Sequence, residues 1–223
     1  MPNSNHKVIA VIPAYNESAK VGQVVKDVLG YADEVIVVDD CSKDSTSEAA
    51  RSAGATVIRH EKNTNYDGAL TTGFAEAARH GATIIFSIDA DGQHKATDIP
   101  RLINPIKEGR ADIVIAQRSS ITHFAEKIFA FYTRHHFGVK DPLCGMKAYS
   151  RAAYDAIGTF DTTKSIGTEL MLRAIASGKK AEFIDIVCLE REAGDSSRFY
   201  SRKLKANMKI FKAMLRVMKK VGF

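Results

Sequence analysis

Residues 82–94 read Ala-Thr-Ile-Ile-Phe-Ser-Ile-Asp-Ala-Asp-Gly-Gln-His, an apolar run followed directly by two carboxylates. The run is rich in β-branched and aromatic residues, which predicts a buried strand. Asp89 and Asp91 stand two residues apart at the end of that strand, and Gly92 lets the chain turn sharply. Such a pair can converge on a hard divalent cation, although an acidic turn that caps the next helix gives the same pattern.

The rest of the chain alternates short apolar runs with helical patterns. This order predicts an α/β fold, with a mostly parallel central sheet and helices on both of its faces. We expect strands at 7–12, 34–38, 56–59, 82–88, 112–116 and 181–189, and helices at 19–29, 45–53, 68–79, 97–105, 124–137, 170–176 and 200–221.

Polar residues gather where the first four predicted strands end. Pro13-Ala14-Tyr15-Asn16-Glu17 follows the first strand, Asp39-Asp40 the second, Arg59-His60 the third and Asp89-Ala90-Asp91 the fourth. Because parallel α/β sheets bind ligands beyond the carboxyl ends of their strands, we expect the four segments to share one rim. Neither of the glycine-rich phosphate-binding patterns GxGxxG and GxxxxGK[ST] occurs, so a metal ion and basic side chains would have to hold any phosphates.

Composition limits the possible classes of protein. A chain of 223 residues that is 45% hydrophobic can bury one sizeable core, and we expect a domain over 1–199 with an extension over 200–223. The net charge of +6 favours an acidic partner. There is no signal-peptide pattern and no apolar run long enough to span a bilayer. Three widely spaced cysteines without a CxxC predict a reduced, cytoplasmic protein.

The ordered set of motifs resembles the family-2 glycosyltransferases of GT-A fold, and among them the dolichyl- or polyprenyl-phosphate sugar transferases. It covers roughly residues 7–200. The resemblance implies an inverting transfer of a sugar from a nucleoside-diphosphate sugar, with Mg²⁺ or Mn²⁺, to a polyprenyl phosphate. A sugar hydroxyl of a glycolipid or polysaccharide is the alternative acceptor. The resemblance rests on segments 11–17, 37–46, 63–73, 89–94, 117–119 and 141–147 and on Glu169.

The resemblance also implies roles for the rim residues. Asp89, Asp91 and Gln93 would form the metal set, with Asp91 as the principal ligand and His94 beside the set. The other residues also have purely structural interpretations. Residues 13–17 could be a turn that ends the strand, Arg118 and Arg134 could be ordinary solvated arginines, and residues 191–198 could be a linker to the last helix. The nucleotide and its diphosphate would be bound by Pro13, Ala14, Tyr15, Glu17, Asp39, Asp40, Asp89, Arg118, Arg134, Arg191, Ser196 and Arg198.

Asp91, Glu169 and Arg118 are the expected catalytic residues. A sugar hydroxyl needs a base, and the resemblance implies that Glu169 supplies it. A phosphate acceptor is already ionised and needs much less help. Glu169 would then be a carboxylate that complements the dipole at the start of helix 170–176.

The last predicted helix carries an apolar seam and a basic stripe. We expect it to lie on an anionic membrane, which would place the protein peripherally at the inner face. Core packing with a solvated basic side, or a homodimer seam, are the alternatives; no nucleic-acid partner is expected. The seam comprises Tyr200, Leu204, Phe211, Met214, Met218 and Val221, and the stripe comprises Lys205, Lys209, Lys212, Arg216 and Lys219.

Two other classes of protein could use a similar sheet. A sugar-nucleotide pyrophosphorylase would carry a glycine- and arginine-rich loop near its N-terminus, and this sequence has none. A basic membrane or nucleic-acid adaptor would have no use for the Asp89/Asp91 pair. The sequence therefore favours the transferase over both.

Overall fold

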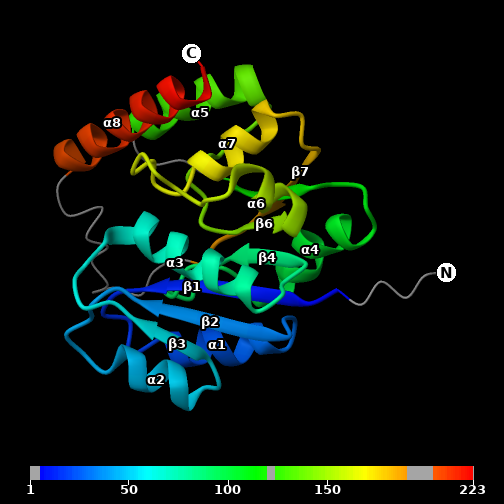
Figure 1. Cartoon of the computed structure of the whole chain (residues 1–223). Helices are drawn as coiled ribbons and strands as arrows, with labels where there is room; N and C mark the ends of the chain where they lie inside the picture. Colours follow the sequence, from blue (N-terminus) through cyan, green and yellow to red (C-terminus); the bar gives the residue numbers. More distant parts are fainter. Residues whose placement is uncertain (1–5, 120–123, 190–202, 223) are drawn as a thin grey trace.

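A seven-stranded sheet runs through the computed structural model of the chain, with helices on both faces (Figure 1). The structure describes residues 6–119, 124–189 and 203–222. The strands are β1 Val8–Ala14, β2 Glu34–Asp39, β3 Thr56–Arg59, β4 Ile84–Ser87, β5 Ile113–Arg118, β6 Lys147–Ser150 and β7 Ala181–Ile186. The helices are α1 Val21–Leu29, α2 Thr46–Ser52, α3 Asn65–Arg79, the short 3-10 helix η1 Ala96–Asp98, α4 Ile99–Lys107, α5 Phe124–Phe137, α6 Arg151–Ile157, α7 Glu169–Ala176 and α8 Lys203–Val221.

The strand order is β3-β2-β1-β4-β6-β5-β7. All neighbours pair in parallel except β6, which runs antiparallel to both β4 and β5. The mostly parallel α/β sheet is therefore confirmed. Strand β6 and helix α6 were not predicted, because β6 is only four residues long and opens with a lysine rather than an apolar run.

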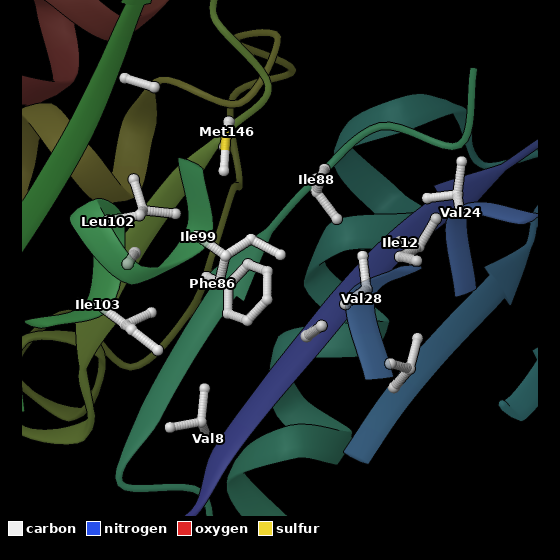
Figure 2. Packing of buried hydrophobic residues seen from close by; sticks show 14 of the residues in the cluster. Val8, Ile12, Val24, Val28, Phe86, Ile88, Ile99, Leu102, Ile103 and Met146 are labelled. Carbon is white, nitrogen blue, oxygen red and sulfur yellow. The ribbon is translucent and has the colours of Figure 1, made fainter. Parts of the chain in front are cut away.

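Alternate residues of the buried strands supply two cores. On β1, Val8 and Ile12 face one side of the sheet, where they pack with α1 and α4 (Figure 2). Ile9 and Val11 face the other side, where α3, α5, α7 and α8 cover the sheet. This period of two is what a strand buried on both faces requires.

Two prolines lie inside elements that were expected to stop at or before them. Strand β1 continues through Pro13 to Ala14. It can do so because β4 pairs only with Val8 to Val11, so the missing N–H of Pro13 has no partner strand on that side. Helix α4 likewise continues past Pro105 to Lys107. The bounds of α5 agree with the prediction at both ends.

Helix α8 packs against α5 and α7 as part of the helical layer. Ile210, Met214 and Val217 are buried there, and Met218 packs against the same core. The predicted membrane seam is therefore wrong for Met214, Met218 and Val221, which belong to the core; Tyr200 and the Leu204 side chain lie outside the described residues. Among the helices of the described chain, none is long and apolar enough to cross a membrane.

Candidate active site

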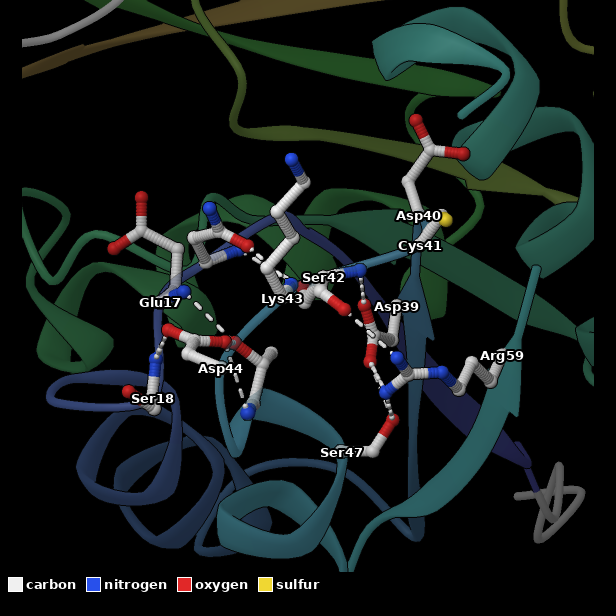
Figure 3. A network of polar contacts seen from close by, with 12 residues as sticks. Glu17, Ser18, Asp39, Asp40, Cys41, Ser42, Lys43, Asp44, Ser47 and Arg59 are labelled. Atoms are coloured by element: carbon white, nitrogen blue, oxygen red, sulfur yellow. Dashed lines mark hydrogen bonds and ion pairs between the residues drawn. The ribbon is translucent and has the colours of Figure 1, made fainter. Parts of the chain in front are cut away.

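The loops that follow β1 and β2 are joined by side-chain hydrogen bonds at the expected rim (Figure 3). The backbone N–H of Asn16 donates to Ser42 Oγ at 2.8 Å, and the Asn16 side chain accepts from the N–H of Lys43 at 2.7 Å. The N–H of Glu17 donates to Thr46 Oγ1 at 2.8 Å. Asn16 has a φ of 54°, a left-handed conformation that asparagine tolerates better than most residues. These contacts fix the backbone that carries Glu17.

Pro13, Ala14 and Tyr15 form the approach to this loop. Ala14 is buried at the end of β1, whereas Pro13 and Tyr15 are partly exposed. The carbonyl of Ala14 accepts from the N–H of Asp40 at 2.9 Å, which holds the two strand ends together. The rim therefore includes the residues of 13–17 that the sequence indicated.

Asp39 is a structural residue rather than an accessible one. Its side chain has no exposed surface, and its carboxylate accepts from the N–H of Ser42 at 2.8 Å, from Ser47 Oγ and from Arg59 Nη1 at 3.0 Å (Figure 3). A carboxylate with this set of donors closes the turn after β2. Its predicted contact with the nucleotide is not supported.

Asp40 links the end of β2 to the start of α3. Its Oδ1 accepts from the N–H and Oγ1 of Thr64, at 2.7 and 2.8 Å, and lies 2.8 Å from His60 Nδ1. Asp40 is 3% exposed. Figure 3 shows its carboxylate pointing away from the Asp39 network. The two adjacent aspartates thus hold different parts of the rim.

Asp89 sits at the centre of a second polar cluster. Tyr66 donates its hydroxyl to Asp89 Oδ1 at 3.1 Å, and His94 Nε2 lies 3.3 Å from Asp89 Oδ2. Burial alone would raise the pKa of Asp89, but the hydrogen bond and charge of His94, together with the Tyr66 hydroxyl, lower it. Burial would lower the pKa of His94, whereas its bonds to Asp89 and Cys188 raise it to about 10. The contact between the His94 ring and Asp89 Oδ2 therefore helps to orient the Asp89 carboxylate.

Gly145 is the backbone support of Asp89. A Cβ added at Gly145 would overlap the Asp89 carboxylate, so any other residue there would displace that carboxylate. The carbonyl of Gly145 accepts from Ser87 Oγ at 2.7 Å, which fixes the segment against β4. Lys147, two residues on, is buried and donates to the carbonyls of Pro142 and Gly167, each at 2.9 Å. The sequence contained both residues in its 141–147 motif but gave neither a role.

Asp91 lies in the turn that leaves β4 and is partly exposed. Its Oδ1 accepts from the N–H of Gln93 at 3.1 Å. Gln93 also bonds to Leu189 twice: its carbonyl accepts from the Leu189 N–H at 2.9 Å, and its side-chain amide donates to the Leu189 carbonyl at 3.2 Å. The turn is therefore tied to the end of the β7 segment.

The donor set at this turn fits a hard divalent cation. Asp89 and Asp91 supply carboxylate oxygens, which Mg²⁺ and Mn²⁺ prefer. Over residues 6–119, 124–189 and 203–222, no three His, Cys, Asp or Glu side chains gather closely enough to hold an ion by themselves. An ion bound by this pair would complete its shell with oxygen ligands from outside the pair, such as water or the phosphates of a substrate.

Arg118 is bound by acidic partners. Its guanidinium makes a two-pronged contact with Asp141, at 2.7 and 2.9 Å, and reaches Glu126 at 2.5 Å. Burial would lower the pKa of Arg118, but Asp141 and Glu126 raise it further above its usual value. Two carboxylates thus occupy the guanidinium of Arg118, and its role in phosphate binding stays a prediction. Arg134 is exposed in the last turn of α5, about 12 Å of helical rise beyond Glu126, and its role in phosphate binding stays a prediction.

Glu169 opens α7 but has no exposed surface. Its carboxylate accepts from the N–H of Thr162 at 2.6 Å, from the Thr162 hydroxyl at 2.8 Å and from Arg173 at 3.2 Å. Burial would raise the pKa of Glu169, but the hydrogen bonds from Thr162 and the charge of Arg173 lower it. The structure thus favours the interpretation of Glu169 as a carboxylate at the start of a helix over its interpretation as a catalytic base. Arg191, Ser196 and Arg198 lie outside the described residues.

Comparison with known proteins agrees with this arrangement. The model of glycosyl transferase family 2 matches residues 9–161. An undecaprenyl-phosphate mannosyltransferase of Micrococcus luteus is 28% identical over 214 residues, 85% of this chain and 86% of its own. A UDP-N-acetylglucosamine–dolichyl-phosphate N-acetylglucosaminyltransferase of Methanococcus voltae is 28% identical over 177 residues, 66% of this chain and 70% of its own.

A solved structure shows the same fold. Glucosyl-3-phosphoglycerate synthase of Mycobacterium tuberculosis, crystallised with Mn²⁺ and UDP-glucose, superposes with a TM-score of 0.70 at 20% identity, over 85% of this chain and 72% of that one. The sheet and its covering helices are thus the GT-A-like α/β fold that the motifs implied. From its motifs, its fold and the match over residues 9–161, the chain belongs to glycosyl transferase family 2, and it is related to the sugar transferases that act on polyprenyl phosphates.

Proposed function

We propose that the enzyme transfers a sugar, with inversion, from a nucleoside-diphosphate sugar to a polyprenyl phosphate at a membrane surface. The observation that carries the proposal is the Asp89–Asp91 turn. Tyr66, His94 and Gly145 hold its first carboxylate in one orientation beside the loops that follow β1 and β2. A binding module would gain nothing from a carboxylate held in this way.

Residues Asp89 and Asp91 would hold a Mg²⁺ or Mn²⁺ ion, with the donor diphosphate supplying further ligands. When bound, the ion would neutralise the negative charge that develops on the leaving nucleoside diphosphate. The relative crystallised with Mn²⁺ and UDP-glucose supports this assignment. The 13–17 loop, fixed by its bonds to the loop after β2, would position the nucleotide at the same rim.

The state of Glu169 supports a phosphate acceptor. A hydroxyl acceptor needs a base within hydrogen-bond reach. Glu169 is fully buried, and Thr162 and Arg173 occupy its carboxylate, so it is poorly placed to take a proton from a substrate. A phosphate oxygen is already ionised, can attack the sugar without that help, and displaces the nucleoside diphosphate from the opposite side. The two relatives named for undecaprenyl and dolichyl phosphates agree with this choice.

A donor screen followed by an acceptor test would check the proposal. The rise in melting temperature with each nucleoside diphosphate, with and without Mn²⁺, would identify the base, since a specific ligand stabilises the folded state by mass action. The corresponding sugar nucleotides would then be offered with a polyprenyl phosphate, with the same polyprenol lacking its phosphate, and with a glycolipid. We expect product only with the phosphate, and only with a divalent cation. Transfer to the glycolipid alone would overturn the acceptor, and product in excess chelator would overturn the metal.

A further inference from the structure

Exposed apolar side chains gather on two adjacent helices. Ten large hydrophobic residues of the described chain are exposed, and six of them lie on α5 and α8. A patch of this kind on a protein surface usually marks an interaction site. We call these six residues the α5–α8 face: Phe124, Ile128 and Phe131 on α5, and Met208, Phe211 and Leu215 on α8.

The six side chains lie on exposed stripes of two helices that pack against each other. Spacings of three and four residues place each set of three on a single stripe of its helix. The two helices lie side by side on the outside of the helical layer (Figure 1). Asn207, one residue before Met208, accepts from the backbone N–H of Ala125 at 3.0 Å. The exposed stripe of α8 therefore starts beside the first turn of α5.

The α5–α8 face is not an unfilled part of the core. Helix α8 already buries a different stripe, which includes Ile210, Ala213 and Val217, and α5 buries Phe129 and Thr133. Phe131 remains 78% exposed and Phe211 44% exposed. The face is thus a second apolar surface, additional to the one that packs these helices onto the sheet.

Basic side chains border the face. Lys127 of α5 is exposed beside Ile128, and α8 has no acidic residue over its described length. The one acidic residue near the start of α5, Glu126, is buried against Arg118. The exposed basic residues of α8 include Lys205, Lys209, Lys212, Arg216 and Lys219.

We propose that the α5–α8 face docks on an anionic lipid bilayer, with its apolar side chains in the headgroup boundary and its lysines on lipid phosphates. A second copy of the chain suits the face less well, because a two-fold interface would bring the same basic stripe close to itself. An anionic bilayer would instead relieve the repulsion among these like charges. This inference rests on the proposed function only in giving the docking a purpose.

The position of the face fits such a purpose. Helix α5 begins six residues after Arg118, the last residue of β5, and its first turn contacts that arginine through Glu126. Docking by this end of the helices would therefore bring the rim close to the bilayer surface. The phosphate of a membrane-embedded acceptor lies at that level.

Vesicle co-sedimentation of the full-length protein would test the proposal. The vesicles would contain phosphatidylcholine alone or with phosphatidylglycerol. We expect the double variant Phe131→Asn/Phe211→Asn to bind anionic vesicles on the order of 10-fold more weakly than wild type, because it removes apolar surface that enters the boundary. Lys212→Gln should weaken binding by about 5-fold, the equivalent of about 1 kcal/mol. The control Val187→Asn, at an exposed apolar position outside the face, should bind as wild type does.

Equal sedimentation of wild type and the double variant would overturn the proposal. The proposal would also be overturned if neither protein bound vesicles while wild type was a dimer and the double variant a monomer. The occupant of the face would then be a second copy of the chain. Transfer to a short-chain, water-soluble prenyl phosphate should persist in the double variant. Vesicle binding needs neither donor nor acceptor. Wild-type protein that binds anionic vesicles but transfers no sugar to any prenyl phosphate would therefore count against the proposed function alone.

Discussion

Two pairs of aspartates end neighbouring parts of the same sheet, and the structure uses them differently. Asp39 and Asp40 are buried, with donors from Ser42, Arg59 and Thr64 on their carboxylates. Asp89 and Asp91 are partly exposed in the turn after β4. A carboxylate pair after a buried strand therefore indicates the rim, but the donors that reach it decide whether it supports the fold or faces a substrate.

Replacing Asp39 should have the largest effect on stability. The Asp39→Ala substitution would leave the N–H of Ser42, the Ser47 hydroxyl and Arg59 without their common acceptor. We expect the free energy of unfolding to fall by about 3 kcal/mol, as measured by urea denaturation. Asp39→Asn, which keeps an acceptor oxygen, should cost less. A variant that unfolds as wild type does but binds nucleotide poorly would show that Asp39 belongs with the substrate-facing pair.

The Gly145→Ala substitution should impair catalysis more than folding. The added Cβ would displace the Asp89 carboxylate, and a displacement of about 1 Å at a catalytic group can cost on the order of 10²-fold in rate. We expect a fall in kcat and a higher Mn²⁺ requirement, both measured in the transfer assay. Gly30→Ala is the matched control, since Gly30 has a helical backbone and room for a methyl group. Unchanged Mn²⁺ dependence in Gly145→Ala would show that Gly145 does not position the Asp89 carboxylate.

The Glu169→Gln substitution should have the smallest effect on the rate. Glutamine keeps an acceptor for Thr162 but loses the charge that faces Arg173. With a polyprenyl-phosphate acceptor we expect less than about a 10-fold fall in kcat, together with a lower melting temperature. A base in a proton transfer would contribute typically 10²–10⁴-fold. A loss of that size, without loss of stability, would restore Glu169 as the base and favour a hydroxyl acceptor.

The sequence was sufficient to predict the sheet and the rim, because both follow from local patterns. Apolar runs located most of the strands, and the ends of parallel strands meet at one edge. The partners of the charged residues were not predictable in this way. Arg118 donates a hydrogen bond to Asp141, which lies 23 residues further along the chain. The two residues are brought together only because the chain folds back to the end of β5. The roles of Arg118 and Glu169 depend on such contacts.

In the last helix, too, the sequence pattern did not predict which residues contact the rest of the protein. The spacing of its apolar residues indicated two-sided character, and the predicted basic stripe is exposed. The stripe that faces the core, however, includes Ile210 and Val217, which the predicted seam lacked, whereas Phe211 of the predicted seam is exposed. This difference depends on how α5 and α7 pack against α8, which no periodicity encodes.

Titration of the enzyme with Mn²⁺ and the nucleoside diphosphate found in the donor screen tests the central claim, that the Asp89–Asp91 turn binds the metal–diphosphate. Wild type, Asp91→Asn and the control Asp155→Asn, at an exposed position on α6, would be compared by calorimetry and in the transfer assay. The account predicts that Mn²⁺ strengthens nucleotide binding in wild type and Asp155→Asn. In Asp91→Asn this effect should vanish and turnover should fall by at least about 10²-fold, with an unchanged melting temperature. Near wild-type turnover of Asp91→Asn throughout the Mn²⁺ titration would contradict it.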